Sequence, residues 1–119
     1  MASNAPALFI PLKREHYEAF VSGEKNIEYR AYCKRWNENV CRIGRHVVLS
    51  LGYGKQRRVS GVIVGYAVRT FGALGLPVRR QLLALYGEQH PANIACIHIA
   101  IEGTYKGGKW QAQELEQTT

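Results

Sequence analysis

The chain has 119 residues, of which 46% are hydrophobic and 21% charged, a composition typical of one globular domain that excludes a disordered or low-complexity chain. Its longest apolar runs, such as Val62–Val64 and Ile94–Ile97, are far shorter than the roughly 20 residues of a membrane-spanning helix, and its first residues lack the pattern of a signal peptide. Lysine and arginine total 16 against nine acidic residues, and the formal net charge of +7 predicts attraction to polyanions, nucleic acid first among them.

The first two elements expected along the chain are a short strand and a helix. Ala7–Leu12 is apolar and ends beside Pro11, which is typical of a strand closed by a bend. Arg14–Ser22 has its apolar side chains one helical turn apart, so we expect an amphipathic helix of about two turns. Gly23 follows, and a glycine at this position predicts a left-handed cap that stops the helix.

A strand and a loop follow this helix. Asn26–Cys33 alternates between apolar and polar residues, which indicates a half-buried strand. Lys34–Arg45 has no such periodicity and predicts a loop. The apolar face of the strand is expected to carry Ile27, Tyr29 and Ala31, while its open face displays a charged pair, Glu28 and Arg30.

Two further strands are predicted beyond this loop. His46–Leu51 is an apolar strand pattern, and Gly52–Gly54 is a turn. Arg58–Arg69 predicts a long strand. Gly61 and Gly65 interrupt it, and glycines inside a strand often mark bulges or sharp barrel corners.

The last two elements are a second helix and a buried strand. Pro77–Tyr86 begins with a proline, which suits the first helical turn. Ile94–Ile101 is almost entirely apolar and β-branched, so we expect a central strand buried on both faces.

Together the elements predict an α+β fold, a small mixed β-barrel of five to six strands with two short helices. This domain would span residues 7–105, between a flexible N-terminal arm (1–6) and a C-terminal tail (106–119).

The cysteines indicate a reducing compartment. Cys33, Cys41 and Cys96 are odd in number and lack C-x-x-C spacing, so we expect free or structural thiols in a cytoplasmic protein. A zinc site built from Cys33, Cys41 and His46 would need a fourth ligand at an irregular spacing. We therefore expect no metal and no cofactor.

The segment that ends at Arg30 carries the most chemical information. A helix, a tight glycine turn and a strand bring Lys25, Glu28 and Arg30 together, because residues two apart on a strand lie about 6.5–7 Å apart on one face. A guanidinium can grip a phosphate in bidentate fashion, and a carboxylate can accept from an exocyclic amine of a base. The three side chains favour an anion or nucleobase site. The alternative is a plain surface ion pair, which contributes under about 1 kcal/mol to stability.

The pattern Gly23-x-Lys25-x-x-Glu28-x-Arg30, preceded by an aromatic helix, resembles the G-x-K-x-x-E-x-R signature of the ASCH domain family. The resemblance extends more weakly over residues 8–103. It implies a PUA-like β-barrel, related to domains that bind RNA, with a cleft that the signature residues line. The implied function is the binding of RNA or a nucleotide in this cleft.

The same resemblance implies an enzyme as the alternative function. Some small bacterial members of the family are amidohydrolases that remove acyl groups from modified cytidines with a lysine and a threonine of the signature and a distant glutamate, and another member is a ribonuclease. Lys25 matches the lysine, whereas Glu28 stands at the threonine position, and Thr70–Gly72, near the place of the glutamate, contains no acid. Lys25, as base or nucleophile, and Glu28, as proton acceptor, are the candidate catalytic residues.

Aromatic residues are interleaved with basic ones along the chain from Lys25 to Arg58. Base stacking on aromatic faces, beside cations that contact phosphates, is a common way of holding single-stranded RNA. The alternatives are that Trp36 caps the barrel mouth and that the run after the glycine turn is a solvated hairpin tip. The expected partner is RNA or a nucleoside or nucleotide, and not a membrane. The candidate binding residues are Arg30, Tyr32, Trp36, Tyr53, Lys55, Arg57 and Arg58.

Overall fold

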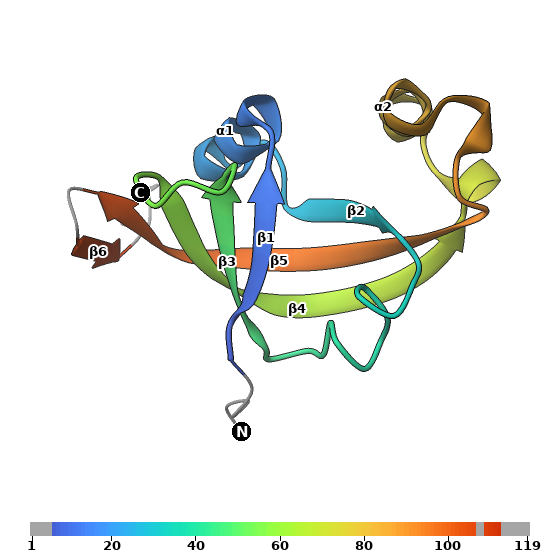
Figure 1. Cartoon of the computed structure of the whole chain (residues 1–119). Helices are drawn as coiled ribbons and strands as arrows, with labels where there is room; N and C mark the ends of the chain where they lie inside the picture. The colour runs from blue at the N-terminus through green and yellow to red at the C-terminus, as the bar shows by residue number, and fades with distance from the viewer. Residues whose placement is uncertain (1–5, 107–108, 113–119) are drawn as a thin grey trace, which may run out of the picture.

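One curved sheet, assembled from strands far apart in the sequence, forms the frame of the molecule (Figure 1). The structure is a computed structural model that describes residues 6–106 and 109–112, and the remainder of the predicted arm (1–6) and tail (106–119) lies outside the described residues. In chain order the elements are β1 (Leu8–Leu12), α1 (Arg14–Ser22), β2 (Ile27–Ala31), β3 (His46–Leu51), β4 (Arg58–Thr70), the 3-10 helix η1 (Phe71–Ala73), α2 (Leu76–Tyr86), the 3-10 helix η2 (Gly87–Gln89), β5 (Asn93–Lys106) and β6 (Lys109–Ala112).

The sheet is mixed and curls into a half-barrel. Its strand order is β1-β3-β4-β5-β2, in which β1 and β3 are parallel and the other pairs antiparallel. This confirms the small mixed sheet with two helices. Within the described residues, β1 and β2 are edge strands that are not paired with each other, so the small barrel is open on one side. We call the gap between these two strand edges the seam. Strand β6 pairs with β5, and it lies within residues 106–119, which were predicted to form a tail.

Strand β5 supplies side chains to two separate hydrophobic clusters. Ala95, Ile97 and Ile99 pack in a cluster that includes residues of α1, and Ile94 and Cys96 pack in a second one beneath α2. Successive side chains on a strand point to opposite faces, so α1 and α2 cover opposite faces of β5. The prediction of a strand buried on both faces at Ile94–Ile101 is confirmed over the first residues of β5.

A glycine turn after α1 places the first part of the candidate site. The helix has the predicted bounds and ends at Gly23, whose φ of 87° lies in the left-handed region that glycine adopts without strain. The Lys25 N–H donates to the carbonyl of Ala19 at 3.0 Å, so the chain doubles back along the helix before β2 begins. None of the helices in residues 6–106 is long and apolar enough to cross a membrane.

Strand β4 is bulged where glycines were predicted to bend it, with register shifts at Ser60/Gly61 and Ile63/Gly65. At Gly61 an added Cβ would lie 2.7 Å from the carbonyl oxygen of Ala100. We expect Gly61→Ala to lower the free energy of unfolding by about 1–3 kcal/mol, because backbone must shift to admit the methyl group. Urea denaturation measures this loss. Gly54→Ala is the matched control, since an added Cβ meets nothing within 4 Å there, and equal losses in both variants would contradict the steric explanation.

Candidate functional site

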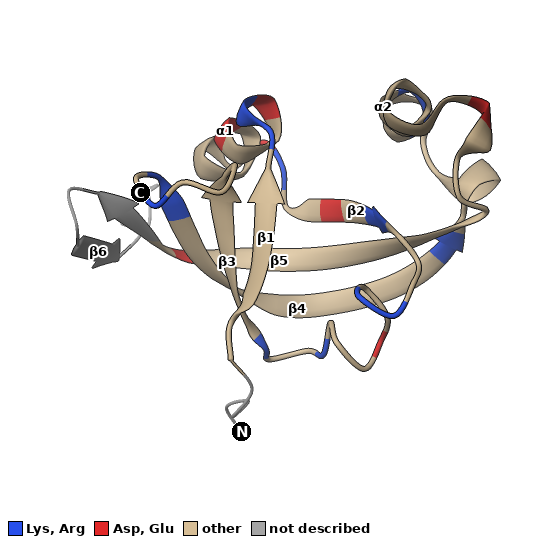
Figure 2. Cartoon of the chain, in the orientation of Figure 1, with Lys and Arg blue, Asp and Glu red and all other residues tan. Residues whose placement is uncertain are grey.

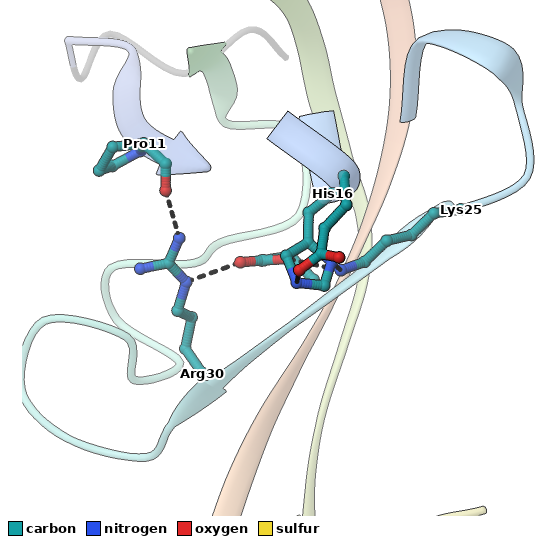
Figure 3. Close-up of polar contacts among 6 residues, drawn as sticks. Pro11, His16, Lys25 and Arg30 are labelled. Atoms are coloured by element: carbon teal, nitrogen blue, oxygen red, sulfur yellow. Dashed lines mark hydrogen bonds and ion pairs between the residues drawn. The ribbon is translucent and has the colours of Figure 1, made fainter. Parts of the chain in front are cut away.

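The structure brings Lys25, Glu28 and Arg30 together around one carboxylate. Lys25 Nζ donates to Glu28 Oε1 at 3.0 Å, and Arg30 Nε donates to Glu28 Oε2 at 2.8 Å (Figure 3). Each carboxylate oxygen therefore accepts a hydrogen bond from a different cation. Charge-assisted hydrogen bonds of this kind are about twice as strong as neutral ones, so the three side chains hold one another in a fixed arrangement.

The face of β2 that carries Glu28 is covered, and the prediction of an open charged face is wrong. Glu28 is only 6% exposed. Arg30 extends across the seam, where its Nη2 donates to the carbonyl of Pro11 at 2.7 Å (Figure 3). Nε and Nη2 of Arg30 each donate one hydrogen bond within the protein, so the guanidinium is partly engaged before any ligand binds. Through these bonds Arg30 acts as a side-chain link between the two edge strands.

His16, which the sequence analysis missed, is the fourth member of this cluster. Its Nδ1 lies 3.3 Å from Lys25 Nζ (Figure 3). An ammonium group can only donate, so Nδ1 accepts and the ring proton of a neutral His16 sits on Nε2. The sequence contains a signal that could have placed His16 near Lys25. His16 and Phe20 are one helical turn apart and lie on one face of α1, and the turn at Gly23 brings Lys25 back along that helix.

His16 makes the stability of the fold sensitive to acid. Burial, and then the neighbouring Lys25, lowers the pKa of His16 below its ordinary value of 6.5. A group with a depressed folded-state pKa contributes stability that is present above its unfolded pKa and is lost as the pH falls, because the unfolded state binds more protons. We expect the free energy of unfolding, measured in urea, to decline from about pH 7 to about pH 5. It should decline less in His16→Gln, and an equal decline in both proteins would assign the effect to other groups.

A cleft of about 230 Å³ opens at the seam beside this cluster. We call it the seam cleft. It is smaller than the roughly 300–1,000 Å³ of a site for a drug-sized molecule, and it suits a group of about the size of one base. Its walls are Pro11–Lys13 from the junction of β1 and α1, His16 from α1, Glu28–Arg30 from β2, and Gln81, Leu85 and Tyr86 from α2.

The main chain of Tyr29 faces this cleft. Tyr32 N–H donates to Asn93 C=O at 3.0 Å, and Ile99 N–H donates to Asn26 C=O at 2.9 Å. The hydrogen-bonded positions on an antiparallel strand recur every two residues, so the even-numbered residues of β2 turn their main chain toward β5. The N–H and C=O of Tyr29 therefore point the other way, from the free edge of β2 into the seam. Among the described residues neither group has a hydrogen-bond partner.

Two of the predicted stacking residues are engaged within the protein. Trp36 is 5% exposed and belongs to the α1 cluster, with the guanidinium carbons of Arg30 and Arg35 at 4.8 and 4.9 Å from its ring. Its prediction as a base-stacking residue is wrong because the loop after β2 folds the ring into the core. The Tyr32 hydroxyl donates to the Glu38 carboxylate at 2.7 Å, and this contact holds the ring against the same loop.

Of the remaining predicted binding residues, Lys55 and Arg57 line a second hollow, and Tyr53 and Arg58 are next to its lining residues in the chain. Tyr53, Lys55 and Arg57 are exposed in the loop between β3 and β4, and Arg58 is half-buried. Figure 2 shows the blue cationic residues of this loop near the start of β4, and Arg14 at the start of α1 lines the same hollow. The structure therefore places one group of predicted site residues at the seam cleft and another at this loop, while Tyr32 and Trp36 belong to neither group.

The cysteines are not part of either group. Cys33, Cys41 and Cys96 are free thiols, and the last two are buried. Burial raises the pKa of Cys41 to about 11, so its thiol is protonated and unreactive at neutral pH. Within the described residues, no group of three or more His, Cys, Asp or Glu side chains is placed to hold a metal ion.

Comparison with known proteins identifies the fold. No protein-family model and no curated protein matches this chain. The structure resembles the crystal structure of a mutant of ZmASCH from Zymomonas mobilis, with a TM-score of 0.58 and 10% sequence identity over 89% of this chain and 82% of that one. The chain therefore has an ASCH-like fold, as the signature in its sequence indicated.

Proposed function

We propose that this chain binds a nucleoside or nucleotide unit of RNA in the seam cleft. The observation that carries the proposal is the main chain of Tyr29 at the seam edge of β2, which has no hydrogen-bond partner among the residues that the structure describes. Its N–H and C=O offer a donor and an acceptor side by side, which complements the hydrogen-bonding edge of an unstacked base. The Nε2–H of His16 adds a donor at the rim of the same cleft.

In this proposal the Lys25–Glu28–Arg30 cluster positions the cleft and does not contact phosphate. Glu28 fixes two cations, and Arg30 in turn fixes Pro11 across the seam. The cluster thereby sets the distance between the two strand edges. A preorganised gap of this kind spares the ligand the free-energy cost of ordering the site.

The test is a titration of the ¹⁵N-labelled protein with nucleoside monophosphates, followed by amide chemical shifts. We expect the Tyr29 amide to shift, because its N–H faces the cleft. The Arg30 amide is a matched internal control, because it lies next in sequence but is turned toward β5. Shifts confined to other surfaces, or larger at Arg30 than at Tyr29, would overturn the proposal.

A second candidate function is hydrolysis of acylated cytidines. One observation favours it: Lys25 and His16 hydrogen bond at 3.3 Å beside Glu28, so a proton can pass between them at the wall of the cleft. Against it, an ammonium that donates to two acceptors has no lone pair for attack on a carbonyl. Incubation with a panel of N4-acylcytidines separates the two functions. Release of cytidine that Lys25→Ala abolishes, in a folded protein, would establish hydrolysis, and an intact panel would exclude it for these substrates.

A further inference from the structure

We infer that a second, basic groove beside the seam cleft binds the continuing chain of a single-stranded RNA. This inference rests on the proposed function and names its ligand as an oligonucleotide. The groove has a volume of about 390 Å³ and is lined by Arg14, Leu51, Gly54, Lys55, Gln56 and Arg57. Among its lining side chains, three are cationic and none is acidic.

The groove and the seam cleft lie on the two sides of the junction between β1 and α1. Lys13 lines the cleft and Arg14 lines the groove. These are consecutive residues, about 3.8 Å apart at their Cα atoms. In this inference an RNA chain that leaves the cleft crosses the junction of β1 and α1, where Lys13 and Arg14 supply two adjacent positive charges, and then enters the groove.

The basic loop that forms the groove is held in place from within. The carbonyl of Gly54 accepts from Ser50 Oγ at 3.1 Å and from Arg58 Nε at 3.3 Å. The carbonyl of Arg57 accepts from the Leu51 N–H at 3.1 Å. These bonds fix the loop while the Lys55 and Arg57 side chains remain exposed. A preorganised set of cations loses less entropy when it binds phosphates.

An exposed aromatic ring beside the groove favours a nucleic acid over an acidic protein. Tyr53 is 78% exposed, and its ring centroid lies 6.1 Å from that of Phe9. An aromatic face beside phosphate-binding cations is the arrangement on which single-stranded bases stack.

One acidic side chain lies close to a cation of the groove: Glu18 Oε1 is 3.5 Å from Arg14 Nη1, and both side chains are more than half exposed. Such exposed pairs are weak, so a phosphate can take the place of Glu18.

The experiment compares uridine 5′-monophosphate with hexauridylate, a single-stranded RNA of six nucleotides, by calorimetric titration over a range of salt concentrations. We expect the hexamer to bind more tightly than the monomer. The double variant Lys55→Gln/Arg57→Gln should lose this gain and keep its affinity for the monomer. For this double variant, the slope of log K against log salt for hexamer binding should be smaller in magnitude by about 1.4. This corresponds to about 0.7 for each of two lost phosphate contacts. Tyr53→Ala should weaken hexamer binding by about 5- to 150-fold.

The matched control is Lys34→Gln/Arg42→Gln, which removes the same charge from exposed sites outside the groove. If the hexamer binds no more tightly than the monomer, or if the control pair costs as much as the groove pair, the groove inference is overturned while the proposed function stands. If uridine 5′-monophosphate, and every other nucleoside monophosphate, fails to bind, the proposed function falls and the inference falls with it. A hexaglutamate peptide that binds as tightly as hexauridylate would assign the groove to acidic proteins and overturn the inference.

Discussion

Glu28→Ala is expected to lower the free energy of unfolding by about 3–5 kcal/mol, as the removal of one partner from a buried ionic network does. The Glu28 carboxylate bonds Lys25 Nζ at 3.0 Å and Arg30 Nε at 2.8 Å, and those side chains are only 14% and 22% exposed. Without Glu28 two cations stay largely buried with no counter-charge. Urea denaturation at neutral pH measures the loss.

Two other variants identify the cause of that loss. Glu28→Gln keeps an acceptor oxygen and the side-chain volume, so its loss should be smaller than that of the alanine variant. Glu18→Ala removes an exposed carboxylate that pairs with Arg14, and it should cost under about 1 kcal/mol. If Glu28→Ala cost no more than Glu18→Ala, the cluster would be a plain surface ion pair without any role in holding the seam.

Trp36→Ala is expected to cost about 3–5 kcal/mol of stability, the usual range for a large aromatic side chain removed from a core. The ring is 5% exposed within the α1 cluster. The main chain of Trp36 is also bound, since the Tyr66 hydroxyl donates to its carbonyl at 2.6 Å. Thermal or urea unfolding reports the loss. Any effect of Trp36→Ala on the proposed RNA binding should follow its effect on folding.

Tyr53→Ala provides the contrast with Trp36→Ala. Tyr53 is 78% exposed, so its removal should change stability by no more than about 0.5 kcal/mol. It should nevertheless weaken the proposed binding of single-stranded RNA. The opposite result, a Trp36 variant that stays as stable as the native protein and loses RNA directly, would restore Trp36 as a stacking residue and contradict its assignment to the core.

The local parts of the structure could be predicted from the sequence. Helix α1, its stop at Gly23 and the strand at His46–Leu51 depend on residues close in the chain, and all three are found where the patterns placed them. The grouping of Lys25 with Glu28 and Arg30 is local for the same reason, because a turn and a two-residue strand spacing are enough to produce it.

Burial could not be predicted in the same way, because it depends on segments that are distant in the sequence. Arg30 and Pro11 are 19 residues apart, and only the curl of the sheet brings them together. Trp36 lies in a loop without periodicity, and it is held through Tyr66, 30 residues further along the chain. A sequence pattern does not contain these contacts. An expected open face thus became a covered one, and an expected stacking ring became part of the core.

The position of β5 couples the folding of the two hydrophobic clusters. Its alternate side chains belong to two clusters, one with residues of α1 and one beneath α2, and its backbone pairs with both β4 and β2. Neither cluster can survive when β5 leaves the sheet. The two halves of the molecule are thereby thermodynamically coupled, and a partly unfolded species with one half intact has no stable basis. Unfolding should be a single cooperative transition.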